Sequence, residues 1–206
     1  MRTHDDFMRD FAHSSTPHDT SYDSGYGTLP PDEDLSHRKR TRTIHPSHSI
    51  CRDWMIVSGN CHYARDSASF TTYTPSTTTI KNNIFNLFDE MHVSGVGSVQ
   101  LTVPATPGDP TIFSTLVLED VLHIPEAVCN GFNPLLVGSS MSCHPGYWEG
   151  KDRMGRAMWF GLPLAGLGRL VLKPGEGEGV SELIEGRQYT LSLYISPEEK
   201  GVILGR

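Results

Sequence analysis

The chain has 206 residues, with 17 lysines and arginines against 24 aspartates and glutamates, and a formal net charge of −7. General nucleic-acid binding needs a broad face of Lys and Arg to neutralise phosphates, so the acidic balance disfavours that class of partner. The most apolar uncharged stretch, residues 157–168, contains Pro163 and is shorter than the roughly 20 residues that a helix needs to cross a bilayer. The N-terminus lacks the continuous apolar core of a signal peptide. We therefore expect no membrane-spanning segment and an intracellular protein, either cytoplasmic or nuclear.

The first 50 residues differ from the rest in composition. Only 11 of them are hydrophobic, and they hold six of the ten histidines. Such a segment cannot bury enough apolar surface to offset the entropy of ordering it, so we predict a disordered tail over residues 1–50. Within it, the range Arg38–Arg42 has four cations in five residues, a pattern that binds nuclear import receptors or phosphates. The alternative interpretation is a solvated charge run in a flexible linker.

From Cys51 onward, short apolar runs alternate with Gly, Pro, Asn and Ser, which predicts strands separated by turns. The predicted strands are Trp54–Val57, Met91–Val93, Val99–Val103, Ile112–Val121, Leu135–Val137, Met158–Leu162, Leu170–Leu172 and Tyr189–Tyr194. Pro104–Pro110 is predicted to be a hairpin loop, and Pro174–Gly179 a second loop.

Helix signals are few. Lys81–Glu90 has apolar residues spaced for one helical face, but three asparagines weaken the pattern. Ser196 followed by Pro197 and two glutamates is typical of a helix start, and we expect Gly201 to keep that helix short. The sum is a mainly β domain of many short strands, a barrel or a sandwich.

The four cysteines form no C-x-x-C pair, and their number is low for a disulfide framework. The dipeptides Cys61-His62 and Cys143-His144 would make a zinc site only if folding joined them. Adjacent side chains on a strand point to opposite faces, so both members of a pair rarely reach one metal. We therefore predict free thiols at these positions and at Cys51 and Cys129, with no metal and no other cofactor.

Four blocks follow one another between residues 53 and 143: Asp53–His62, Val93–Leu101, Leu118–Pro125 and Asn130–Val137. Their order and spacing resemble the retropepsin-like β-barrel domain of copia-type retrotransposon Pol polyproteins. The run beginning Ser196-Pro197-Glu198-Glu199 is similar to endings of fungal reading frames with degenerate domains of this kind. The resemblance implies a retropepsin-like barrel over 51–143, between the predicted disordered tail over 1–50 and a strand-rich extension over 144–206 with a short terminal helix.

The resemblance also bears on catalysis. Retropepsins form a homodimer in which each chain contributes the Asp of an Asp-Ser/Thr-Gly turn, and the two carboxylates share one proton over a bound water. In this sequence the turn has Val57, Ser58 and Gly59. Because an apolar side chain can neither bind the water nor carry the proton, we expect no catalytic residue here and no protease activity, even in a dimer. If the domain binds a ligand, analogy with the fold alone would place the site in the groove near Val57–His62.

In two alternative hypotheses the protein is an active hydrolase with a relocated catalytic residue. In the first, another acid replaces the lost one: Asp53 lies about 13 Å along the strand from position 57, and Asp66 lies beyond the turn. Asp23-Ser24-Gly25 matches the motif, but its polar surroundings offer no strands to hold a catalytic turn. In the second, a Cys-His pair acts as nucleophile and base. The candidates for that pair are Cys61, Cys129, His123 and His144. A third, non-enzymatic alternative is nuclear nucleic-acid association through Arg38–Arg42.

Overall fold

The computed structural model describes residues 50–81, 90–176, 179 and 181–205, which belong to one compact unit. The predicted tail, apart from Ile50, lies outside the described residues, as do the Arg38–Arg42 cluster and Asp23-Ser24-Gly25. The core of the predicted helix over Lys81–Glu90 also lies outside them, although Lys81 and Glu90 themselves are in strands.

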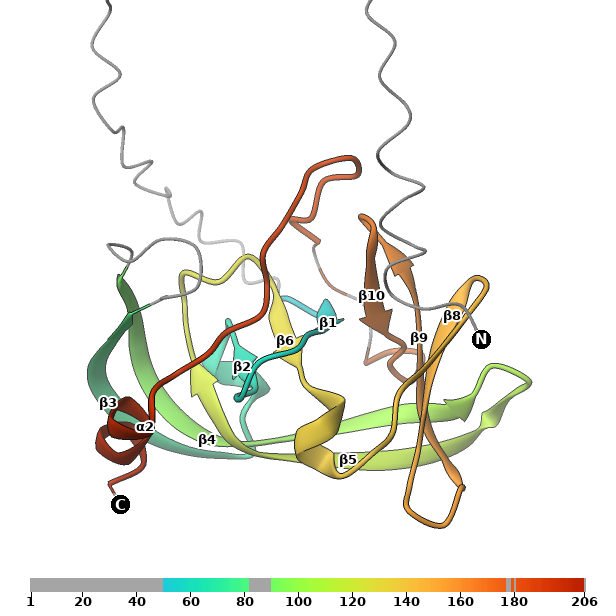
Figure 1. The fold of residues 1–206 in the computed structure, drawn as a ribbon, viewed down its shortest axis with the longest axis horizontal. Coiled ribbons are helices and arrows are strands. Elements are labelled where there is room, and N and C mark those ends of the chain that lie inside the picture. Colours follow the sequence, from blue (N-terminus) through green and yellow to red (C-terminus); the bar gives the residue numbers. More distant parts are fainter. Residues whose placement is uncertain (1–49, 82–89, 177–178, 180, 206) are drawn as a thin grey trace, which may run out of the picture. The chain divides into compact units, whose positions relative to one another are not determined.

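The described residues form one mixed sheet of ten strands (Figure 1). The strands are β1 (Trp54–Ile56), β2 (Tyr63–Ala64), β3 (Thr72–Lys81), β4 (Glu90–Thr106), β5 (Asp109–His123), β6 (Asn130–Phe132), β7 (Ser142–His144), β8 (Tyr147–Lys151), β9 (Ala157–Leu164) and β10 (Leu167–Leu170). Their spatial order is β3-β4-β5-β2-β6-β1-β10-β9-β8-β7. The prediction of a mainly β domain is confirmed. The sheet is open, with β3 and β7 at its edges, so the expected closed barrel is not confirmed.

The hairpin of β4 and β5 is the longest pairing in the sheet and curves under the shorter strands (Figure 1). Its register runs from Gly95 opposite His123 to Thr106 opposite Asp109. The predicted hairpin is therefore present, but its turn is tighter than Pro104–Pro110, because Pro104 pairs within β4 beside a register shift. β4 also joins two predicted strands, Met91–Val93 and Val99–Val103, into one.

Strand β1 lies in the middle of the sheet and leads into the candidate site. It pairs in parallel with β6, where Met55 is opposite Gly131, and antiparallel with β10, where Met55 is opposite Arg169. Trp54 packs in the cluster that contains Phe132, while Met55 packs in a second cluster on the other face. Both faces of β1 are covered, which explains its continuous apolar run. Through β10, the strands of the C-terminal extension join the same sheet.

Three predicted strands are wrong or displaced. Leu135–Val137 lies in a 3-10 helix, η2 (Pro134–Val137), because the Asn133 side chain accepts a hydrogen bond from the Leu135 N–H at 3.0 Å and caps it. A second 3-10 turn, η1 (Ser67–Ser69), precedes β3. Strand β10 ends at Leu170, where the prediction began, because the hairpin turn lies before Leu167.

The third error is Tyr189–Tyr194, which contains no strand. Only Leu193 forms an isolated bridge, with Gly59. Most hydrogen bonds of this segment join it to the irregular chain between β1 and β2 and not to a regular strand. The segment therefore stays irregular although its sequence is typical of a strand.

The terminal helix α2 (Pro197–Leu204) is confirmed. Ser196 Oγ accepts from the Glu199 N–H at 3.1 Å, and Glu199 Oε2 accepts from the Ser196 N–H at 2.7 Å, which completes a capping box. The helix is short, with 8 residues, as expected, but it continues through Gly201 to Leu204 and is capped by Gly205, so Gly201 is not what limits it. A single interior glycine costs a helix only about 1 kcal/mol. In the described part of the chain, no helix has the length and apolar character needed to cross a membrane.

Candidate functional site

Val57, the residue at the position of the expected catalytic Asp, belongs to the core. Its side chain is 6% exposed and packs in a cluster with Cys51, Met55 and Cys129. Its N–H donates to the Phe132 carbonyl at 2.9 Å, which extends the β1 to β6 pairing by one residue. The structure therefore holds an apolar packing residue at this position, with no group that could bind water or carry a proton.

Ser58 and Gly59 occupy the place of the expected turn: they follow β1, Gly59 forms an isolated bridge with Leu193, and the chain bends at Asn60. Gly59 has φ +112, and a Cβ there would lie 2.2 Å from the Leu193 carbonyl oxygen. The Ser58 N–H donates to Ser192 Oγ at 3.1 Å, and the two hydroxyls are 2.8 Å apart. Two separate features therefore require glycine at position 59: the left-handed backbone and the close approach of the C-terminal chain.

Residues 191–195, which we call the covering segment, lie against this turn. Asn60 is the main anchor: its Nδ2 donates to the Ile195 carbonyl at 2.7 Å, and its Oδ1 accepts from the Ile195 N–H at 2.9 Å. Its backbone N–H also donates to the Leu193 carbonyl at 3.2 Å. Farther along, the Tyr63 hydroxyl donates to the Leu191 carbonyl at 2.7 Å. The turn is thus covered by a segment of its own chain, more than 130 residues away in sequence.

His62 is a buried histidine with a defined tautomer. Its side chain is 2% exposed, and its ring stacks on Phe132 with centroids 6.0 Å apart. Nδ1 accepts the Asn133 N–H at 3.1 Å, so the neutral ring carries its proton on Nε2. Burial lowers the pKa of His62 to about 4, so the ring is neutral at pH 7.

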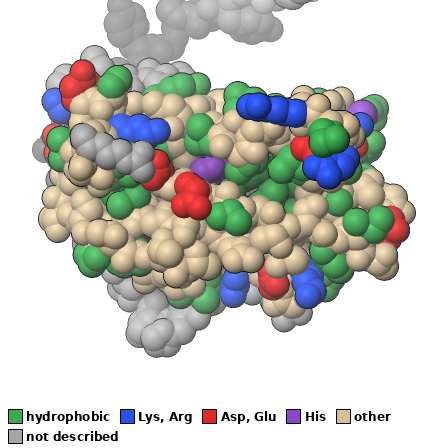
Figure 2. Space-filling view, turned by 90° about the horizontal axis from the view of Figure 1, so that it is seen from below, with side chains coloured by type: hydrophobic (Ala, Val, Ile, Leu, Met, Phe, Trp, Pro, Cys, Tyr) green, Lys and Arg blue, Asp and Glu red, His purple; other side chains and the backbone are tan. Residues whose placement is uncertain are grey.

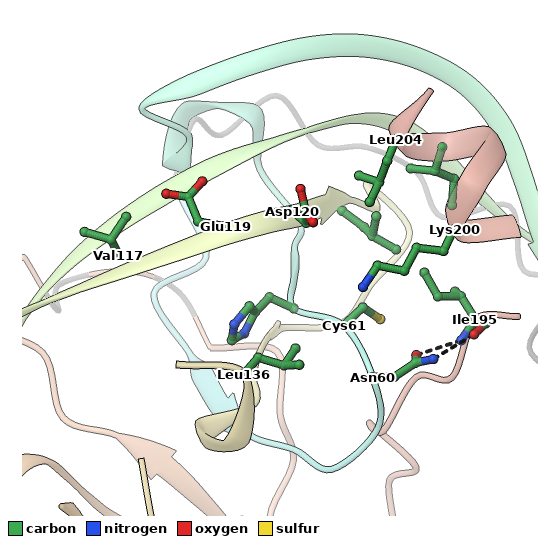
Figure 3. A pocket seen from close by; sticks show the side chains of 12 residues that line it. Asn60, Cys61, Val117, Glu119, Asp120, Leu136, Ile195, Lys200 and Leu204 are labelled. Carbon is green, nitrogen blue, oxygen red and sulfur yellow. Dashed lines mark hydrogen bonds between the residues drawn. The ribbon is translucent and has the colours of Figure 1, made fainter. Parts of the chain in front are cut away.

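A cavity of about 170 Å³ lies beside the turn, between β5, η2 and α2 (Figure 3). Its polar lining is Asn60, Cys61, His62, Glu119, Asp120 and Lys200. Its apolar lining is Val117, Leu122, Leu136, Ile195, Ile203 and Leu204. Asp120 has φ 52, a left-handed conformation that Asp tolerates, where β5 is out of register with β4. The Lys200 side chain extends from α2 toward Cys61 (Figure 3).

The two acids weighed as relocated catalytic groups have structural partners. Asp53 is 5% exposed, and its Oδ1 lies 3.3 Å from Arg169 Nη1, across the β1 to β10 pairing. Asp66 Oδ2 accepts from the Cys51 N–H at 2.8 Å. Neither lines the cavity. The acids that do line it, Glu119 and Asp120, belong to the block Leu118–Pro125, and no local signal in the sequence marks them as cavity residues.

The two candidate cysteines are buried thiols. The Cys61 thiol donates to the Leu193 carbonyl at 3.6 Å, and burial raises its pKa to about 12. Burial likewise raises the pKa of Cys129 to about 12. Because the thiolate is the nucleophilic form, neither cysteine has the activated state that a Cys-His mechanism needs at neutral pH.

The two candidate histidines are engaged elsewhere. His123 Nδ1 lies 2.8 Å from the Tyr73 hydroxyl, and its ring meets Tyr73 edge-on. His144 stacks on Tyr147, and its Nε2 lies 3.2 Å from Glu149 Oε1. Both histidines therefore have partners that position them without a cysteine.

The Cys-His dipeptides do not meet as a metal centre. All four cysteines are free; Cys61 is buried beside the turn, whereas Cys143 is exposed on β7. Within the ranges that the structure describes, no group of three or more His, Cys, Asp or Glu side chains is placed to hold a metal ion.

Comparison with known proteins provides no relative for this site: no family model, no curated protein and no solved structure matches the chain. The roles of the side chains around the turn are therefore argued from their own geometry.

Proposed function

We propose that this protein is a retrotransposon-derived, retropepsin-like β domain that has no protease activity and binds a ligand beside its degenerate turn. The observation that carries the proposal is Val57, a buried apolar residue directly before Ser58 and a left-handed Gly59. Peptide hydrolysis by two carboxylates needs one on each half-site. With Val57 in each chain, even two paired chains would have none at this position.

The hydrogen bonds of the other candidates support the same proposal. Asp53 and Asp66 are tied to Arg169 and to the Cys51 backbone, and the Cys61 thiol is protonated and buried. The cavity beside the turn, by contrast, combines apolar walls with several polar groups, which is the usual character of a ligand site.

The charge distribution supports a small ligand over a nucleic acid. On the face shown in Figure 2, basic side chains lie in small groups between acidic and hydrophobic ones, with no broad basic patch among the residues described there. Phosphate neutralisation requires such a patch.

The test is a cleavage assay. The purified full-length protein is incubated with a broad peptide library from acid to neutral pH, beside the variants Asp53→Asn, Asp66→Asn and Cys61→Ser. We expect no cleavage by any of them above a heat-denatured control. Cleavage by the wild type that one substitution abolishes would establish the rival function, an active hydrolase with a relocated residue.

A further inference from the structure

The donor on His62 is the first element of a ligand site. Because Nδ1 accepts the Asn133 N–H, the Nε2–H is the free donor of the ring, and His62 lines the cavity. No partner of Nε2 is found among residues 50–81, 90–176 and 181–205. An oxygen of a ligand in the cavity would give this N–H an acceptor, and a charged oxygen makes the stronger hydrogen bond.

Lys200 places a positive charge in the same cavity. Its side chain lies along the cavity from α2 (Figure 3), close enough for its charge to act on the Cys61 thiol. In the described part of the chain, no carboxylate lies within salt-bridge distance of it. A neutral N–H donor and an ammonium lining one cavity suit a carboxylate better than a neutral oxygen.

The walls and the volume limit what else the ligand contains. Six aliphatic side chains line the cavity, and about 170 Å³ is far below the volume of a drug-sized site. Leu136, which is 47% exposed, and Val117, which is 52% exposed, extend the apolar surface to the rim. The cavity therefore has room for one branched apolar side chain, close to the carboxylate that it accompanies.

The acids Glu119 and Asp120 restrict the chemical class of the ligand further. Both line the cavity from β5, and Glu119 is exposed at its edge. Two carboxylates oppose a doubly charged anion such as a phosphate, and they can accept an N–H from a ligand. The ligand should therefore carry a single carboxylate with an adjacent nitrogen donor.

We infer that this cavity binds an α-amido or α-amino carboxylate with a branched apolar side chain, which is the chemistry of a peptide C-terminus and of a free apolar amino acid. The carboxylate contacts His62 Nε2–H and Lys200, the nitrogen faces the acids of β5, and the side chain contacts the aliphatic walls. This inference deepens the proposed function and rests on it, since the ligand is bound and not hydrolysed.

The test is calorimetric titration of the full-length protein with four probes: N-acetyl-L-leucine, its carboxamide N-acetyl-L-leucinamide, free L-leucine and 4-methylpentanoate. We expect saturable one-to-one binding of at least one of the first and third probes. The carboxamide should bind about tenfold more weakly than N-acetyl-L-leucine or not at all, and 4-methylpentanoate more weakly than the better α-nitrogen probe. Tighter binding of N-acetyl-L-leucine identifies a peptide terminus as the source, and tighter binding of L-leucine identifies the free amino acid.

Two pairs of variants locate the binding. Lys200→Met should weaken the affinity about tenfold, whereas Lys173→Met, an exposed lysine over the Phe113 ring, should change it less than about twofold. Leu136→Ser should weaken it several-fold, whereas Leu135→Ser, its more exposed neighbour in η2, should not.

Equal affinity for the acid and the carboxamide, an unchanged affinity in Lys200→Met, or no saturable binding of either α-nitrogen probe would each overturn the inference. None of these results would alter the cleavage assay. Cleavage of peptides by the wild type would overturn the proposed function and leave the binding data intact, so the two failures are distinguishable.

Discussion

At the scale of single residues, Val57 lies in the core at the position where the resemblance would place a catalytic Asp. Val57→Asp would place a carboxylate against Cys51, Met55 and Cys129. We expect a loss of about 3 kcal/mol in the free energy of unfolding at pH 7 and no gain of cleavage. The loss should shrink at acid pH, because burial raises the pKa of the new carboxyl and it folds protonated. Urea unfolding of Val57→Asp and of the uncharged control Val57→Thr measures this; an unchanged stability of Val57→Asp would contradict it.

Gly59 gives a second residue-scale prediction. Gly59→Ala meets both a left-handed φ of +112 and a contact of 2.2 Å with the Leu193 carbonyl oxygen. Gly166→Ala, between β9 and β10, is the matched control, since it has φ +74 and nothing within 4 Å of the added Cβ. We expect Gly59→Ala to lose about 3 kcal/mol and the control about 1 kcal/mol in thermal or urea unfolding. Equal losses would show that the covering segment does not press on the turn.

His62 makes stability depend on pH. Its pKa falls from 6.5 to about 4 on folding, so between these values the unfolded chain binds the proton and the folded chain does not. Stability is therefore fully present above pH 6.5 and declines as the pH falls toward 4, by about 3 kcal/mol in all. Other groups titrate in the same range, so the readout is the difference in slope between the wild type and His62→Gln from pH 7 to pH 4.5. Parallel slopes would refute the buried neutral ring.

At the scale of elements, local and tertiary signals separate clearly. The helix α2 was predictable because its cap consists of neighbours, Ser196 and Glu199, that bond to each other. The segment Tyr189–Tyr194 was not, because its alternation is typical of a strand while its hydrogen bonds run to residues around Gly59 and Asn60. For η2, the signals of a helix start, Asn133 as the cap and Pro134 in the first turn, are present in the local sequence. The apolar run Leu135–Val137 is also typical of a strand, and this second signal led to the wrong prediction.

The capping box yields a prediction for α2. Ser196→Ala removes the acceptor of the Glu199 N–H, and we expect a loss of about 1 kcal/mol in the free energy of unfolding. Because α2 carries Lys200, the variant should also weaken binding of N-acetyl-L-leucine. Ser142→Ala, an exposed serine on β7, serves as the control in the same urea titration. A loss no greater than that of the control would mean that the cap adds nothing measurable to the packing of Ile203 and Leu204.

At the scale of the whole molecule, the covering segment bears on assembly. A dimer of the kind that the resemblance implies would bring the turns of two chains together, but in this fold Ser192 and Leu193 of the same chain occupy that place. We expect sedimentation equilibrium to give the mass of one chain over micromolar concentrations. A stable dimer of the wild type would contradict the expected monomer.

Asn60→Ala removes the hydrogen bonds that the Asn60 side chain makes to Ile195, so it should increase hydrogen exchange in residues 191–195.

The sequence by itself determined the mainly β character, the apolar residue at position 57, and the capped terminal helix. Each of these depends on residue type or on neighbours within a few positions. Only the tertiary structure decided that the sheet stays open, that residues 191–195 cover the turn, and that Glu119, Asp120 and Lys200 line one cavity with His62. Those features depend on contacts between residues far apart in the chain, and side-chain periodicity carries no information about which distant segments meet.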